Sequence, residues 1–264
     1  MPELPEVETI TRALAPRLAG RRILSAEFRC LRVLRGDPDE TASRLAGKKI
    51  VSVRRRGKFI VMELAGGEFF TVHLGMTGRL LMDGESGRHT HAVLTLDRGT
   101  LLYDDMRQFG RLELSPAMPA RLAKLGPEPL EISLEEFAAR LRGRKTRIKA
   151  LLLNQGFVRG VGNIYADEAL FRARIHPAAF AGRLRGQRIE RLHRAVIEVL
   201  EEAIESRGSS VANYVDADGR KGSFQLKHNV YQRTGEPCVV CSTPIRRILI
   251  AQRGTHYCPK CQRI

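Results

Sequence analysis

Residues 238–261 read CVVCSTPIRRILIAQRGTHYCPKC and carry the most specific local pattern in the chain. Two Cys-x-x-Cys pairs, Cys238 with Cys241 and Cys258 with Cys261, are separated by 16 residues whose apolar positions suit a short β-hairpin. Each pair presents two thiolates to one metal ion, so this spacing predicts a tetrahedral zinc site. Four protein thiolates leave no open coordination position, so we expect one structural Zn²⁺. The alternative is a pair of disulfides or free thiols.

The composition indicates a folded protein with a polyanionic partner. Of 264 residues, 43% are hydrophobic, which excludes a disordered chain or a mini-protein. Lys and Arg number 45 against 29 Asp and Glu, so the formal net charge is +16. Residues 1–130 carry +5 and residues 131–264 carry +11, so we expect the second half to supply most of the attraction.

The compartment follows from the start of the chain and from its hydropathy. The first residues, MPELPEVE, are acidic and proline-rich, whereas a signal peptide is basic and then apolar. No apolar run approaches the roughly 18 residues that span a bilayer. We therefore expect a cytoplasmic protein, in which a reducing environment disfavours disulfides.

Three further residues, a cysteine and two histidines, are expected to be structural. Cys30 is alone in a strand-like stretch and is predicted to be a buried core cysteine. His89 and His91 alternate along a predicted strand, but no third ligand is nearby in the sequence.

The first half of the chain predicts one helix followed by a sheet domain. Apolar residues at helical spacing predict a helix from residue 5 to residue 18, ended by Gly20. From there to about residue 114, short β-branched runs separated by turn signals predict an antiparallel β-sandwich. The expected strands cover residues 50–53, 59–64, 69–74, 80–82, 92–96 and 101–103.

The second half predicts helices after a boundary at residues 125–130, which contain two prolines and a glycine. Ser133 with Glu136 forms a capping box at the start of the first helix. Further helices are expected at about residues 146–154, 164–174 and 189–203. Residues 209–229 lack periodicity, which predicts a long mobile loop.

The beginning of the chain carries a potential nucleophile. If Met1 is removed, Pro2 has a free secondary amine that can attack an electrophilic sugar carbon and form an iminium. Glu3 and Glu6 are close enough to transfer protons around it. The alternative is that both carboxylates merely favour a helix N-terminus.

Long motifs along the whole chain resemble bacterial formamidopyrimidine-DNA glycosylases, within the family that also contains endonuclease VIII. They are PELPEVET (2–9), HLGMTGRL (73–80), LGPEPL (125–130), VGNIYADEALF (161–171), IHP (175–177), and the tail GEPC-x-x-C with AQR-x-T-x-YC-x-x-C. The resemblance implies an α+β fold: an antiparallel β-sandwich with an N-terminal helix, a helix–two-turns–helix region and a β-hairpin zinc finger. The implied domains are 1–124 (catalytic), 125–130 (linker), 131–229 (DNA-binding, with a lesion-capping loop at about 209–229) and 230–264 (zinc finger).

The resemblance also implies an activity. A monomeric bacterial enzyme would remove 8-oxoguanine and formamidopyrimidines from duplex DNA, then cut the abasic strand by β,δ-elimination. Its substrate would be duplex DNA with oxidised bases or abasic sites, encountered at the nucleoid. Two alternatives stay open: an endonuclease VIII-type enzyme for oxidised pyrimidines, and a non-catalytic protein that binds damaged DNA.

Carried over position by position, the resemblance makes Pro2 the nucleophile, Glu3 the general acid/base and Glu6 a further active-site carboxylate. Lys58 matches a phosphate-binding lysine at the catalytic site, and its alternative is a solvated lysine at a strand end.

Four residues match contacts to the DNA backbone: His73, Lys149, Asn163 and Arg253. Asn163 stands at a predicted helix N-terminus, where backbone amides favour an anion. A lone histidine such as His73 is more often structural.

Three residues match the side chains that fill the gap left by an extruded nucleotide. Met76 would enter the vacated space, Phe109 would act as a wedge, and Arg107 would bond to the orphaned base. The family often reads Asp-Pro-Arg-Arg-Phe-Gly here, whereas this chain has Met106 and Gln108. Loss of the proline is expected to loosen the loop, and loss of a basic residue to alter opposite-base preference.

Overall fold

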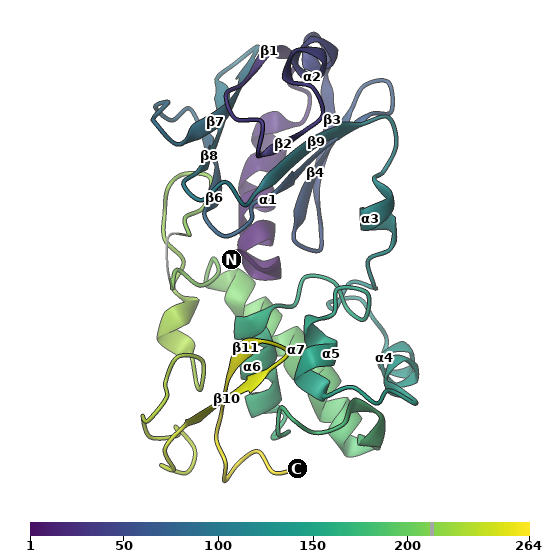
Figure 1. The fold of residues 1–264 in the computed structure, drawn as a ribbon, viewed down its shortest axis with the longest axis vertical. Coiled ribbons are helices and arrows are strands. Elements are labelled where there is room, and N and C mark those ends of the chain that lie inside the picture. Colours follow the sequence, from purple (N-terminus) through teal and green to yellow (C-terminus); the bar gives the residue numbers. More distant parts are fainter. Residues whose placement is uncertain (212–213) are drawn as a thin grey trace. The chain divides into compact units, whose positions relative to one another are not determined.

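The computed structural model describes residues 1–211 and 214–264 and divides into two compact units (Figure 1). The first unit comprises residues 1–124 and 206–223, and the second comprises residues 125–205 and 224–264. The first unit thus contains a segment from the second half of the sequence. No helix in the described ranges is both long and apolar enough to cross a membrane.

Two sheets form the first unit. One has the order β1-β7-β8-β6, with all pairs antiparallel. Its strands are β1 (Ile23–Phe28), β6 (Gly78–Met82), β7 (Thr90–Leu96) and β8 (Thr100–Asp105). The other has the order β2-β9-β5-β4-β3. Its strands are β2 (Leu34–Arg35), β3 (Ile50–Arg56), β4 (Phe59–Leu64), β5 (Phe69–His73) and β9 (Arg111–Ser115).

A single apolar core joins both sheets to helix α1 (Leu4–Leu18). The helix contributes Val7, Ile10, Leu14 and Leu18, each at most 1% exposed. These positions recur at the helical period, so one face of the helix is buried and the other is solvated. The predicted sandwich with an N-terminal helix is confirmed.

Several local features differ from the prediction. The sandwich is not wholly antiparallel, because β2 pairs in parallel with β9. Two short helices, α2 (Pro38–Leu45) and α3 (Ala120–Ala123), were not expected. Cys30 is half-buried in the loop after β1, where it packs against the edge of the core instead of inside it.

The second unit contains four α-helices and a hairpin among its described residues. They are α4 (Leu134–Leu141), α5 (Ile148–Leu153), α6 (Asn163–Arg172), α7 (Gln187–Glu205), β10 (Arg246–Ile250) and β11 (Arg253–Tyr257), with 3-10 turns η1 (Ala181–Arg183) and η2 (Phe224–Lys227). The Ser133 hydroxyl accepts from the Glu136 amide at 3.1 Å, which is the serine half of the predicted capping box and caps α4. Helix α6 packs against α5, α7 and β11, so it is the centre of this unit.

The predicted mobile loop at residues 209–229 is divided between the units. Its described part up to Ser223 belongs to the first unit, where Asp216 Oδ1 accepts from the amides of Asp218 and Arg220 at 3.0 and 2.9 Å. The remainder contains η2. Ala212 and Asn213, which also fall within the predicted lesion-capping loop, lie outside the described residues.

Candidate active site and nucleic-acid interface

The beginning of α1 holds two buried carboxylates next to Pro2, which is itself buried. Glu3 is 3% exposed and Glu6 is 1% exposed. Glu6 Oε2 accepts from the Glu3 amide at 2.7 Å, and Glu6 Oε1 accepts from the Ser209 amide at 2.7 Å. These short bonds fix both oxygens of the Glu6 carboxylate. The Glu3 carboxylate accepts in turn from the Glu6 amide, so the two residues form a capping box at the start of α1, as the structural alternative expected. Glu3 is also the carboxylate adjacent in sequence to the predicted nucleophile.

A glycine allows the residues after α7 to approach Glu6 so closely. Gly208 has a φ of +80°, and a Cβ there would lie 2.7 Å from Glu6 Oε1. Only glycine meets both demands without strain.

Lys58 and His73 lie at one end of the five-stranded sheet. Lys58 occupies the turn between β3 and β4 and is 8% exposed, and the next residue, Phe59, pairs with His73 across β4 and β5. Burial, followed by the positive charge of Lys58, lowers the pKa of His73 to about 4. His73 is therefore neutral at pH 7, and its Nδ1 accepts from the Gly75 amide at 3.2 Å. A neutral imidazole in this tautomer can bind a phosphate oxygen only as a hydrogen-bond donor, through Nε2.

The structure brings the three predicted gap-filling residues together at one surface of the first unit. Met76 lies between β5 and β6, and Arg107 and Phe109 lie between β8 and β9. Phe109 is 51% exposed and Met76 is 43% exposed. Arg107 Nη1 lies 3.2 Å from Met76 Sδ, and its guanidinium carbon lies 4.6 Å from the centre of the Phe109 ring. An exposed cluster of an aromatic ring, a thioether and a guanidinium can replace stacked and paired bases.

Asp105, which the sequence reasoning did not single out, fixes this cluster. Its carboxylate is buried and accepts from Thr77 Oγ1 at 2.5 Å, from Tyr103 Oη at 3.2 Å, and from the Arg107 and Gly110 amides at 3.2 and 2.8 Å. One carboxylate thus joins the two loops that carry the cluster. The loop between β8 and β9, where the family pattern has a proline and this chain has Met106, is thus held by the Asp105 carboxylate.

Gly75 and Gly110 allow these loops to touch. A Cβ on Gly75 would lie 2.5 Å from the Gly110 nitrogen, and one on Gly110 would overlap the Tyr103 hydroxyl. The HLGM and RQFG strings therefore encode a close backbone approach as well as the side chains between them.

Of the two histidines that the sequence predicts to be structural, His91 makes a buried contact in the sandwich. His91 is 6% exposed, and its Nε2 lies 2.8 Å from the Asp105 carbonyl oxygen. Within the described ranges, one group of ligating side chains is close enough to hold a metal ion, and it contains neither His89 nor His91.

That group is the four predicted cysteines. Their sulfur atoms all lie within 4.8 Å of one another. Three separations are 3.9 Å for Cys238 with Cys261, 3.5 Å for Cys241 with Cys258, and 3.4 Å for Cys241 with Cys261. Tetrahedral zinc with bonds of about 2.3 Å requires sulfur separations of about 3.8 Å. The residues therefore fit one Zn²⁺, with no coordination position left for a substrate.

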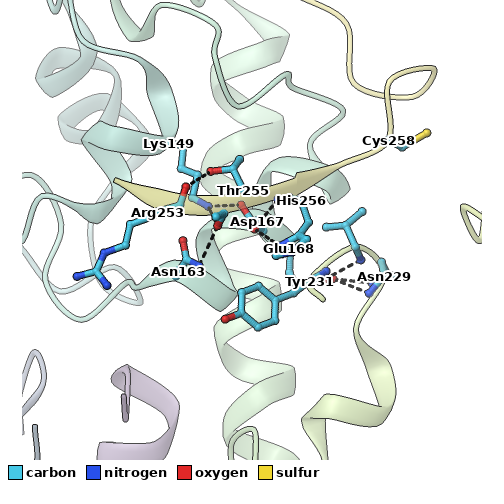
Figure 2. Close-up of polar contacts among 12 residues, drawn as sticks. Lys149, Asn163, Asp167, Glu168, Asn229, Tyr231, Arg253, Thr255, His256 and Cys258 are labelled. Atoms are coloured by element: carbon cyan, nitrogen blue, oxygen red, sulfur yellow. Dashed lines mark hydrogen bonds and ion pairs between the residues drawn. The ribbon is translucent and has the colours of Figure 1, made fainter. Parts of the chain in front are cut away.

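Lys149 is placed differently from a simple phosphate contact (Figure 2). It is 0% exposed, its Nζ lies 2.7 Å from Asp167 Oδ1, and it donates to the Gly254 carbonyl at 3.1 Å. Asn163 Nδ2 donates to the same carbonyl at 3.0 Å. His256 donates its amide to Asp167 Oδ2 at 2.9 Å. In this conformation Lys149 is neutralised by a carboxylate and ties α5 and α6 to the hairpin.

Arg253 lies at the start of β11 and is exposed. Figure 2 shows its side chain extending away from the buried network. The adjacent Gly254 carbonyl is held by Lys149 and Asn163, so the network orients the strand from which Arg253 projects.

Glu168 is a second buried carboxylate that the sequence reasoning passed over. It is 1% exposed and accepts from the amides of Asn229, Val230 and Tyr231 at 2.9, 3.0 and 2.9 Å. It thereby fixes the segment that precedes the zinc finger. The adjacent acids in the ADEAL string were a signal, because two polar residues in an otherwise apolar helix need buried partners.

The comparisons with known proteins agree with this arrangement. Residues 1–112 match the model of the formamidopyrimidine-DNA glycosylase N-terminal domain. Residues 125–215 match that of the formamidopyrimidine-DNA glycosylase H2TH domain. Residues 235–264 match the zinc finger found in FPG and IleRS.

Full-length relatives and solved structures extend this result. The chain is 65% identical to the formamidopyrimidine-DNA glycosylase of Solibacter usitatus, over all of both chains, and 48% identical to that of Symbiobacterium thermophilum, over 99% of this chain and 89% of the relative. It is similar to a Lactococcus lactis FPG mutant in complex with Fapy-dG-containing DNA, with a TM-score of 0.92 and 38% identity over all of both chains. It is also similar to the MutM (FPG) protein of Thermus thermophilus, with a TM-score of 0.90 and 43% identity over 99% of this chain and 98% of that one. The chain belongs to the formamidopyrimidine-DNA glycosylase family.

Proposed function

We propose that this chain is a base excision repair enzyme that removes 8-oxoguanine and formamidopyrimidines from duplex DNA and then cleaves the abasic strand. The family match over the whole chain supports the activity. The net charge of +16 supports action on chromosomal DNA in the bacterial cytoplasm, at the nucleoid.

In the proposed first step, the Pro2 amine attacks C1′ of the damaged nucleotide. Its lone pair forms the new C–N bond while the glycosidic bond breaks, and the base leaves with its bonding electrons and takes up a proton. The amine then loses its own proton, and the C1′–O4′ bond opens as O4′ is protonated, which leaves an iminium. Glu3 is the group that moves these protons.

The second step cleaves the strand. The iminium acidifies C2′, so loss of a C2′ proton expels the 3′ phosphate, and a further elimination expels the 5′ phosphate.

The zinc would be held by Cys238, Cys241, Cys258 and Cys261, where it stabilises the finger.

Recognition is divided among the remaining residues. Met76, Arg107 and Phe109 would occupy the duplex around the extruded nucleotide, which supports a requirement for paired substrate. Lys58 and His73 would bind the backbone from the sheet unit. In the helical unit, Arg253 and Asn163 would bind the backbone. Lys149 would hold the Gly254 carbonyl next to Arg253 and so position that strand.

The observation that carries the proposed chemistry is the pair of buried carboxylates, Glu3 and Glu6, that lie within four residues of Pro2 and are held by hydrogen bonds at the start of α1. It is tested by borohydride reduction of the protein with duplex DNA containing an abasic site. Reduction should give an irreversible protein–DNA crosslink that peptide mass spectrometry maps to Pro2. Protein that retains Met1 is the matched control, because its Pro2 nitrogen is an amide and is not nucleophilic.

Two variants separate the roles. Pro2→Gly should retain some crosslinking, since a primary amine also forms a Schiff base, and Glu3→Gln should lose base excision more than abasic-site cleavage. A crosslink at Lys58 would overturn the assignment of the nucleophile. No crosslink with any lesion or abasic duplex would favour a non-catalytic protein that binds damaged DNA.

A further inference from the structure

Two hollows adjoin each other on the helical unit. One, of about 410 Å³, lies where the end of α4 meets the start of α7, and the other, of about 420 Å³, lies beside Phe180. Both are lined by Gly143 and Gly182. We call the loops 142–147 and 180–185, which border both hollows, the basic groove.

The two loops are held side by side by their backbones. The Gly182 amide donates to the Arg144 carbonyl at 3.0 Å, and the Ala181 amide donates to the Thr146 carbonyl at 2.9 Å. A Cβ on Gly182 would lie 2.7 Å from the Arg144 carbonyl oxygen, so this approach requires glycine. The groove is therefore a built feature of the fold.

Six exposed cations lie in the two loops of the groove: Arg142, Arg144, Lys145, Arg147, Arg183 and Arg185. None of the six forms an ion pair with a carboxylate of the part of the chain that the structure describes. The two loops therefore carry an excess of positive charge that the described part of the protein does not neutralise, and such a surface attracts a polyanion.

Several of these cations are already oriented. Arg185 Nη1 donates to the Gly182 and Leu184 carbonyls at 2.5 and 2.7 Å. The guanidinium carbons of Arg183 and Arg147 lie 5.1 and 3.9 Å from the centre of the Phe180 ring. A guanidinium has five N–H donors, so those that are not used remain available to phosphate oxygens, which they match in geometry.

The groove is separate from the phosphate contacts proposed above. Neither hollow is lined by Asn163 or Arg253, the two residues of the helical unit proposed to contact the DNA backbone. The groove cations are therefore additional to those contacts.

We propose that the basic groove binds the phosphate backbone of duplex DNA outside the segment that contains the lesion. The inference rests on the proposed function, because DNA is the polyanion that a glycosylase meets. Such a contact would raise affinity for undamaged DNA and keep the enzyme on the chromosome between lesions, without any part in the chemistry.

The test removes three groove charges that make no backbone hydrogen bond, in the variant Arg142→Gln/Lys145→Gln/Arg183→Gln. Each phosphate contact contributes about 0.9 to the slope of log affinity against log salt, so the slope on a long undamaged duplex should fall by up to about three. Cleavage of a short duplex with one lesion should be unchanged. The matched control removes three exposed cations of the other unit, Arg32→Gln/Arg98→Gln/Lys124→Gln, and should leave the slope near the wild-type value.

An unchanged slope in the groove variant would overturn the proposal, as would an equal fall in both variants, which would reflect net charge alone. Loss of cleavage on the short duplex would assign the groove to the lesion-binding site instead. If the wild-type protein cleaves no lesion at all, the proposed function fails, yet the slopes on undamaged DNA still test the groove.

Discussion

Replacing Lys149 with methionine should destabilise the helical unit more than it affects DNA binding. The ammonium lies 2.7 Å from Asp167 Oδ1 and both side chains are 0% exposed, so Lys149→Met leaves a buried carboxylate without its counter-ion. Breaking a buried pair in this way costs about 3–5 kcal/mol. For a unit of this size the midpoint of thermal unfolding should fall by roughly 10 to 20 °C.

The double variant Lys149→Met/Asp167→Asn shows whether the pair is the cause. It removes both charges but keeps an oxygen that can accept from the His256 amide, which lies 2.9 Å from Asp167 Oδ2. It should be more stable than Lys149→Met, with a coupling energy of about 2 kcal/mol in a double-mutant cycle. Urea unfolding followed by circular dichroism measures all four proteins.

DNA binding gives the result that would refute this reasoning. A lysine that contacts a phosphate contributes about one unit to the salt dependence of affinity, whereas a lysine neutralised by Asp167 contributes little. If Lys149→Met unfolds like the wild type and lowers the slope by one, the ammonium leaves Asp167 for a phosphate when DNA binds. The predicted direct phosphate contact would then be correct.

Other predictions concern the sheet unit and the finger. The pKa of His73 falls from 6.5 unfolded to about 4 folded, so the unfolded chain binds more protons between these values; stability should drop by about 3 kcal/mol as pH falls from 6.5 to 4, and His73→Phe should flatten this dependence in urea titrations. Phe109→Ala should change stability by less than about 0.5 kcal/mol, because the ring is 51% exposed, yet reduce excision from paired duplex much more than cleavage at a preformed abasic site; equal losses would argue against a wedge. Asp105→Ala should produce the same kinetic pattern with a lower unfolding temperature, since it frees the loop that holds Phe109, and an unaltered ratio of the two activities would remove its positioning role. Cys258→Ser should lower bound zinc well below one equivalent in metal analysis, and full retention would contradict the four-thiolate site.

The sequence alone determined the features that depend on residues close together along the chain. The zinc ligands were recognisable because two residues between cysteines bring both sulfurs of each pair to one metal. The buried face of α1 was predictable because Val7, Ile10 and Leu14 repeat at the helical period. The family strings implied the fold and activity, and the structure and comparisons confirm both.

Only the tertiary structure decided which polar residues are buried and what they contact. Lys149 meets Asp167 and Gly254, and Asp105 joins loops that start from different strands. Nothing in the local pattern distinguishes a lysine aimed at a phosphate from one neutralised inside the protein. A charge becomes internal only when distant segments exclude water from it, and that depends on packing between elements rather than on spacing along the chain.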